Sequence, residues 1–322
     1  MLCLLVGVGW LSVDASIPQA AGGAEGRGRS QLTLSLSDLS ANKPGSILLF
    51  NFYSSSLNPE FENTRVSLTN TDPRQLVRIH TFFIDTVTCS ISIWSVTLTA
   101  SQTVSFLTGE IDPLSTGFII AVAVDEHGCP INFNHLIGEE FVKLVSGHAA
   151  NLAAVSVAAL PGSQSLCDPK AIKADLTFDG IAYNPLPRTV AIDNLPSISN
   201  GNLMMVILNP LGGNLTEGAA VLGNLEGLLF DDLGTSYFFE IPSAGCQLRG
   251  ILQNNFPRTD VPYDMVIPSR RTGWIKYYAV NDQGMHGAAI NYNPDGFSQG
   301  HNLHVLSLTS TAVFTIPIYP PN

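Results

Sequence analysis

Charged residues are scarce in this chain of 322 residues, at 13% of the sequence, which is about half the usual share in a globular protein. Bases are scarcer still, since 15 Lys and Arg stand against 26 Asp and Glu, and the longest basic cluster is Ser269–Arg271. Phosphate binding needs clustered Lys and Arg, so we predict no nucleic-acid partner. Hydrophobic residues make up 45%, which is enough for the chain to fold rather than remain disordered.

Long hydrophobic runs are also missing. No segment reaches the roughly 18 apolar residues that a transmembrane helix needs, so we predict no membrane span. Leu2–Leu11 is an apolar run of the length found in signal peptides, and a Gly-rich stretch follows it up to Ser30. The basic residues that usually precede such a run are absent, and a buried N-terminal strand is the alternative. We predict a signal peptide and flexible leader over residues 1–30, and a mature protein that is secreted or held at the cell surface.

Cysteine is rare, and its spacing excludes the common zinc motifs. Cys3 lies in the expected leader, which leaves Cys89, Cys129, Cys167 and Cys246. No CxxC or CxxH pair occurs. An even number of widely spaced cysteines in an exported chain predicts two disulfides, with three possible pairings. We favour one bridge in each half, Cys89–Cys129 and Cys167–Cys246, and four free buried thiols are the alternative.

Several short motifs occur twice, in the same order and with similar gaps. Single matches are expected by chance in a chain rich in Asn and Gly, but an ordered series is not, so we predict an internal duplication. The matched segments are 47–51 with 190–194, 66–70 with 206–209, 116–119 with 272–275, 123–128 with 279–284, 131–134 with 290–293, and 147–152 with 300–303.

The repeated segments have the patterns of β-strands. Ile91–Leu98 and Thr103–Leu107 alternate apolar and polar residues, which is the period of a half-buried strand. Phe118–Val124 is a continuous apolar run, which predicts a central strand covered on both faces. Turn residues such as Gly and Asx separate the strands. We predict an all-β protein of two tandem antiparallel β-sandwiches, immunoglobulin-like in the broad sense.

The expected first sandwich covers residues 31–162 and the second covers residues 163–322. Pro210–Asp232 has no evident counterpart in the first half and is predicted to be an insertion. Gln31–Leu39 alternates strictly, which predicts a strand that pairs with its own domain or, alternatively, with a neighbouring molecule. Gly147–Leu160 fits a helix by its alanines and a strand by its counterpart in the repeat, and both remain open.

Catalytic signatures are absent: no GxSxG, HExxH, P-loop or GxGxxG motif occurs. We therefore predict no catalytic or cofactor-binding residue, although a triad built from distant segments has no motif to find. The most metal-like cluster is His301 and His304 beside Asp295. Residues three apart on a strand point to opposite faces, so both histidines would meet one ion only if the segment loops.

Two acidic turns lie at matching places of the repeat. Asp125 and Glu126 lie in the first, and Asp282 lies in the second. Calcium takes about six to eight oxygen ligands, and two side chains are too few, so we favour a turn-forming role and keep calcium as the alternative. His148 and His301 also match across the repeat, which favours a role in folding over a duplicated functional site.

Aromatic residues in the strands have two possible roles. Trp94, Trp274, Tyr277 and Tyr278 could stack on sugar rings. Aromatic side chains in alternating strands more commonly belong to the core, because each buries a large apolar area.

Three segments resemble secreted proteins of environmental bacteria: Gly117–Asn134, Leu136–Leu152 and Gly300–Leu303. The resemblance extends over residues 43–160 and 291–317. It implies export and a bacterial source, and no activity.

Two functions remain open. The first is a non-enzymatic surface or matrix protein that binds a protein or glycan at the cell surface, or associates with itself. The second is an extracellular hydrolase or carbohydrate-active protein with a site in the second half, near Asp231 and Asp232. The enzyme requires one of these carboxylates within reach of a base such as His286 or His301. The binding protein should have no deep pocket that unites a histidine with a carboxylate.

Overall fold

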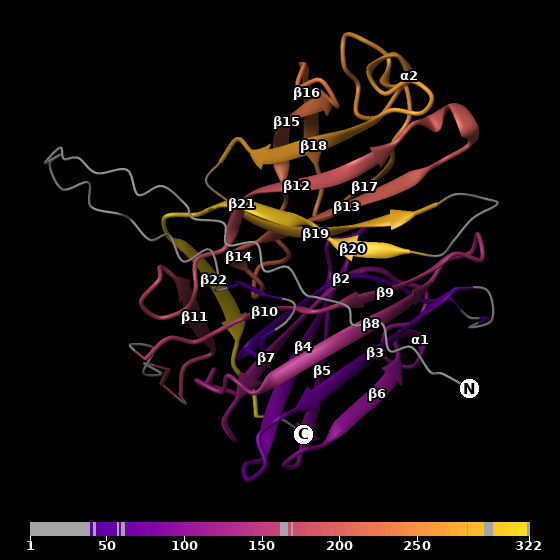
Figure 1. Cartoon of the computed structure of the whole chain (residues 1–322). Helices are drawn as coiled ribbons and strands as arrows, with labels where there is room; N and C mark the ends of the chain where they lie inside the picture. The colour runs from indigo at the N-terminus through magenta and orange to yellow at the C-terminus, as the bar shows by residue number, and fades with distance from the viewer. Residues whose placement is uncertain are drawn as a thin grey trace, which may run out of the picture. The chain divides into compact units, whose positions relative to one another are not determined.

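The structure is a computed structural model, and it describes residues 39–40, 43–56, 58, 62–161, 167–168, 170–281, 283–292 and 299–320. The predicted leader, most of the strand expected at 31–39, and the candidate metal ligands Asp282 and Asp295 lie outside these residues. The secondary structure of the described residues is nearly all β, and its strand pairings are antiparallel except that of β14 with β22, which confirms the predicted all-β class (Figure 1). Among them, no helix is long and apolar enough to cross a membrane.

The first half forms two sheets with the strand orders β1-β10-β2-β7-β4-β5 and β6-β3-β8-β9. The strands expected at 91–98 and 103–107 are found at those positions, and the apolar run at 118–124 lies in the buried central strand β7. The segment left open between helix and strand forms β9 and β10. The elements are β1 (Leu39–Ser40), β2 (Ile47–Ser54), β3 (Asn63–Asn70), β4 (Val77–Asp85), β5 (Ile91–Leu98), β6 (Thr103–Leu107), α1 (Thr108–Ile111), β7 (Thr116–Val124), β8 (Leu136–Lys143), β9 (Ala149–Ala153) and β10 (Val155–Val157).

The second half forms sheets with the orders β16-β15-β18-β12-β21 and β17-β13-β19-β20, and a third sheet with the order β11-β22-β14. The elements are β11 (Lys173–Phe178), β12 (Pro187–Pro196), η1 (Ile198–Asn200), β13 (Met204–Leu211), β14 (Gly213–Asn214), β15 (Gly223–Asp231), β16 (Ser236–Ala244), β17 (Leu248–Ile251), α2 (Tyr263–Val266), β18 (Thr272–Ala279), β19 (Gly284–Asn291), β20 (Gly300–Asn302), β21 (His304–Leu308) and β22 (Ala312–Pro317).

The two halves have the same strand order. The strands β10-β2-β7-β4-β5 correspond one by one to β21-β12-β18-β15-β16, and β6-β3-β8-β9 correspond to β17-β13-β19-β20. A short helix precedes β7 in one half and β18 in the other. This order is what the predicted duplication requires, but their common origin stays a prediction. Within the expected insertion at 210–232, β15 holds the place of β4, so this part belongs to the sandwich.

Hydrophobic cores join the halves. One core combines strands β2, β4, β7 and β10 with the third sheet, for example Phe118 and Ile120 with Leu176 and Phe314. Another combines β8 and β9 of the first half with β13 and β19 of the second. Residues Leu36–Asn322 form one compact unit.

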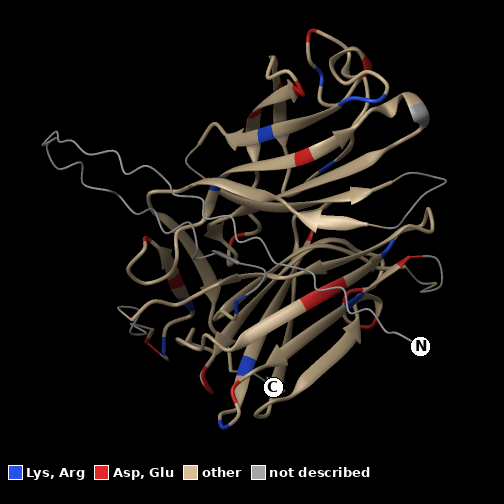
Figure 2. Cartoon of the chain, viewed as in Figure 1, with Lys and Arg blue, Asp and Glu red and all other residues tan. Residues whose placement is uncertain are grey.

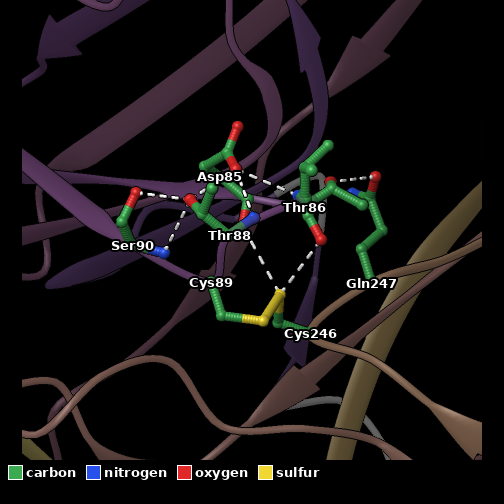
Figure 3. Close-up of a disulfide and its surroundings, with 8 residues drawn as sticks. Asp85, Thr86, Thr88, Cys89, Ser90, Cys246 and Gln247 are labelled. Carbon is green, nitrogen blue, oxygen red and sulfur yellow. Dashed lines mark hydrogen bonds between the residues drawn. A yellow bond between two sulfur atoms is a disulfide. The ribbon is translucent and has the colours of Figure 1, made fainter.

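Both disulfides link the halves. The bridges are Cys89–Cys246 and Cys129–Cys167, each with Cα atoms 5.8 Å apart. Two disulfides were predicted, but the favoured pairing within each half is wrong. The reason is that the turn after β4 lies against the turn between β16 and β17, where Thr86 donates a hydrogen bond to Gln247 at 2.9 Å (Figure 3). Cys246 Sγ lies 3.4 Å from the carbonyl oxygens of Asp85 and Thr86.

Charged residues lie at the turns and at scattered positions on the strands, where uncharged residues outnumber them (Figure 2). The polar surface of the sheets is therefore built largely from uncharged residues. Ser67 pairs with Ser105, and Thr69 with Thr103, at 2.8 Å each on the exposed side of β3 and β6. This uncharged surface agrees with the small share of charged residues in the sequence.

Candidate functional site

A cavity of about 530 Å³ opens in the second sandwich, where β12, β13, β19, β20 and β21 come together. Most of its lining residues are polar, and they contain a carboxylate, two imidazoles and several amides. The apolar part of the wall comes from Pro196, Leu203, Met204 and Ala289. The polar lining residues are Asp193, Asn194, Asn202, Asn291, Gln299, His301, Asn302 and His304.

A β-bulge in β12 brings Asp193 and Asn194 to this cavity. Ile192 pairs with Ile275 of β18 and Leu195 pairs with Gly273, so the two residues between them oppose Trp274 alone. A bulge of this kind bends the strand and redirects side chains. Asn194 has a φ of 50°, a left-handed conformation that asparagine accepts better than most residues.

Two histidines meet the carboxylate of Asp193. The Nε2 atom of His304 lies 3.2 Å from Asp193 Oδ1, and that of His301 lies 4.0 Å from the same oxygen. Burial lowers the pKa of His301, and His304 lowers it further, while Asp193 raises it. The two histidines do not lie on one continuous strand, because β20 ends before Leu303, as in the alternative in which the segment loops. The chain crosses there from β20, paired with β19, to β21, paired with β12.

The first sandwich holds a buried carboxylate at the corresponding place. Its bulge in β2 consists of Asn51 and Phe52, which oppose Phe118 of β7. Glu140 of β8, fully buried, accepts the N–H of Asn51 at 2.9 Å and that of Phe52 at 3.3 Å. Burial raises the pKa of Glu140 well above its ordinary value of 4.5, and the two N–H groups oppose that shift.

Alanine replaces this glutamate in the second sandwich. Glu140 pairs with Val66 of β3, and Ala289 pairs with Val206 at the matched position of β13. Ala289 carries only a methyl group and lines the cavity. The wall of the cavity at Ala289 therefore corresponds to the position that Glu140 occupies in the first sandwich.

Buried amides connect the cavity wall with the junction of the two halves. Asn51 Nδ2 donates to Asn302 Oδ1 at 2.7 Å, and Asn209 Nδ2 donates to the carbonyl of Asn51 at 2.8 Å. Gln247 Nε2 donates to Asn209 Oδ1 at 2.8 Å. His286 Nδ1 lies 2.8 Å from Asn51 Oδ1, which accepts, so Nδ1 carries the proton. Burial lowers the pKa of His286 to about 3, and this histidine is a neutral part of the core.

The acidic residues singled out in the sequence have structural partners. Asp125 accepts the N–H groups of His127 and Cys129, which is a turn-forming role, and Glu126 is exposed. Asp231 accepts the N–H groups of Leu233 and Thr235.

Asp232 pairs with Arg271. Neither Asp231 nor Asp232 has a hydrogen bond to His286 or His301. Within the described ranges, no group of three or more His, Cys, Asp or Glu side chains is arranged to hold a metal ion.

The other singled-out side chains pack against neighbours. His148 is buried, lies 3.2 Å from Ser146 Oγ and stacks on Tyr292. Tyr277 is fully buried in the core of the second sandwich. Trp94 packs against Phe106 and is partly exposed.

Sequence reasoning missed Asp193 and Glu140. The repeat contains a signal for Asp193, since the matched segments 47–51 and 190–194 end at the two bulges, whereas Glu140 lies outside these segments. The sequence match placed Asn194 opposite Asn51, whereas the strand register equates Asn51 with Asp193.

Comparison with known proteins adds little. No protein-family model matches the chain, and no curated protein matches it. The crystal structure of tripeptidyl peptidase 2 aligns with 87% of this chain and 25% of that chain, at 11% identity and a TM-score of 0.21. A similarity of this size carries no argument about fold or function, and the chain spans about a quarter of that protein.

Proposed function

We propose that the protein is an extracellular, non-enzymatic binding module whose cavity between β12 and β20 holds a sugar. The observation that carries the proposal is the cavity itself. Where Glu140 fills the first sandwich, Ala289 leaves room beside Asp193, His301 and His304. Carboxylate, amide and imidazole groups are hydrogen-bond partners for hydroxyl groups, and a sugar presents several of these on a small ring.

The two disulfides support an extracellular location. Two disulfides in one chain are typical of oxidising compartments outside the cytoplasm. The small share of charged residues in the chain also suits a protein that recognises uncharged ligands. Secretion through the segment at 1–30 belongs to this proposal.

A hydrolase is the second candidate, favoured by the contact between Asp193 and His304 at 3.2 Å. Such a pair could act as a general base. However, the described lining contains no Ser, Thr or Cys as nucleophile. It contains a single carboxylate, whereas most glycosidases use two. The pair is therefore better explained as a hydrogen-bonding group for a ligand.

The test is a titration with methyl glycosides of glucose, galactose and mannose, followed by NMR of the histidine ring signals. We expect the ring signals of His301 and His304 to shift when a sugar binds, and we expect these shifts to be smaller in Asp193→Asn. Glu126→Gln is the matched control, because Glu126 is exposed and lies outside the cavity. Unchanged ring signals with all three sugars would refute the binding site.

Asp193→Asn and Glu126→Gln, together with His304→Gln, also distinguish the binding module from the hydrolase. Hydrolysis is measured with nitrophenyl glycosides and esters. An activity that Asp193→Asn and His304→Gln abolish, and that Glu126→Gln retains, would favour the hydrolase over the binding module.

A further inference from the structure

The outer face of the sheet β16-β15-β18-β12-β21 carries a continuous row of side chains that ends at the cavity. Residues paired across antiparallel strands project to the same face. Five strands at about 4.8 Å spacing make this row about 19 Å long. The paired residues, in order from β16 to β21, are Phe238, Leu228, Lys276, Ala191 and His304. His304 also lines the cavity.

Aromatic rings flank this row. Trp274 and Phe230 pair across β18 and β15 and stack face to face, with ring centroids 4.0 Å apart and planes 1° from parallel. Phe230 covers one face of the indole, so a ligand can reach only the opposite face. The strand on that side is β12, where the bulge residues Asp193 and Asn194 oppose Trp274.

Tyr278 lies on the same face as Trp274, with Lys276 Nζ 5.8 Å from its ring centroid. Phe238 is 53% exposed, and Trp274 and Tyr278 are half-buried. None of these aromatic residues belongs to a hydrophobic core formed by the described residues.

The same face of the first sandwich has a different composition, and it is covered by another sheet. The β7 residues that correspond to Trp274 and Lys276 are Phe118 and Ile120. Both are buried, in the core that the third sheet shares with this half. In the second sandwich the row instead mixes aromatic rings with Lys276 and, beside it, the cross-strand pair Glu226 and Glu240. Flat rings among hydrogen-bonding groups suit a ligand that is apolar on its ring faces and hydroxylated at its edges.

We infer that this outer face binds a neutral polysaccharide chain, which continues from the sugar held in the cavity. The inference rests on the proposed function of the cavity and adds the substrate class. The ligand is neutral because the chain has a net charge of −11 and the site has the carboxylates of Asp193, Glu226 and Glu240 beside a single Lys276. Acidic chains would be repelled.

The test is a calorimetric titration with neutral gluco-, manno- and xylo-oligosaccharides, from the monosaccharide to the hexasaccharide. We expect at least one series to gain tenfold or more in affinity with length, and Trp274→Ala or Tyr278→Ala to remove about tenfold of that gain. Monosaccharide binding should survive both changes. Phe141→Ala is the matched control, because Phe141 is 39% exposed on the outer face of β8 in the other sandwich.

Four results would overturn the inference. One is affinity that does not grow with chain length in any series, and another is length dependence that Trp274→Ala and Tyr278→Ala leave intact. A third is a concentration-dependent dimer, seen by sedimentation, that Trp274→Ala abolishes, since a second copy would then be the occupant. Tighter binding of alginate oligosaccharides would refute the neutral ligand. A different result would refute only the proposed sugar site in the cavity. In that case Asp193→Asn would leave monosaccharide binding unchanged, while Trp274→Ala would still remove the gain in affinity with chain length.

Discussion

Glutamine at position 140 should make the stability of the protein less dependent on pH. Glu140 is fully buried, and its raised pKa means that the folded chain holds a proton that the unfolded chain has already released. The contribution of Glu140 to the free energy of unfolding is then complete below the ordinary pKa of 4.5. It falls as the pH rises toward the pKa of Glu140 in the folded protein, because over this range only the unfolded state is stabilised by ionisation. A glutamine cannot ionise, yet its oxygen can still accept the N–H of Asn51.

The size of the effect follows from one proton. Relative to Glu140→Gln, the wild type should lose about 1.4 kcal/mol of unfolding free energy per pH unit, up to a plateau at the folded pKa. Urea unfolding at intervals from pH 4.5 to 8, without reductant, measures both curves. Taking their difference removes the contributions of other groups, such as the buried His286. Glu139→Gln, on the exposed side of the same strand, is the control and should show no such slope. Parallel curves for wild type and Glu140→Gln would refute the reasoning.

Three further predictions concern the disulfides, the amide network and the cavity. Cys246→Ser opens a loop of 157 residues and Cys129→Ser one of 38. Loop-closure entropy gives losses of about 5 and about 4 kcal/mol, which unfolding with and without reductant should reveal, and an unchanged melting temperature would count against the bridges. Asn209→Ala leaves two buried partners unpaired and should cost about 2–5 kcal/mol, measured by urea unfolding; a loss below 1 kcal/mol would contradict the network. Ala289→Glu places a carboxylate in the cavity at the position that Glu140 holds in the first sandwich. NMR titration should then show a folded protein that no longer binds methyl glycosides. Retained binding would mean that the ligand binds elsewhere.

The strands were predictable because their signals are local. The alternation in Ile91–Leu98 and the apolar run in Phe118–Val124 reflect which faces are buried, and this pattern is readable from a short window. The strand character of Gly147–Leu160 was not readable, since alanine suits a helix locally and only pairing with β8 and β2 decides for strands. Fold class therefore followed from the sequence better than individual ambiguous segments did.

The disulfide pairing and the cavity could not be read from local patterns. Cys89 meets Cys246 because the cores of the two halves merge, and no spacing along the chain encodes that docking. The site depends on two local irregularities, the bulge at Asp193 and the break of the strand at Leu303, which together turn His301 and His304 toward one carboxylate. Each irregularity violates the regular strand geometry on which the sequence argument relied.

The nested arrangement of the two disulfides has a consequence for resistance to proteolysis. Because Cys89 is joined to Cys246 and Cys129 to Cys167, a single cleavage anywhere between positions 89 and 246 leaves the pieces covalently attached. A nicked molecule should keep its full mass on a non-reducing gel and separate into fragments only after reduction. Peptide-bond hydrolysis in this stretch, about half the chain, therefore releases nothing until a second cut or a reductant follows.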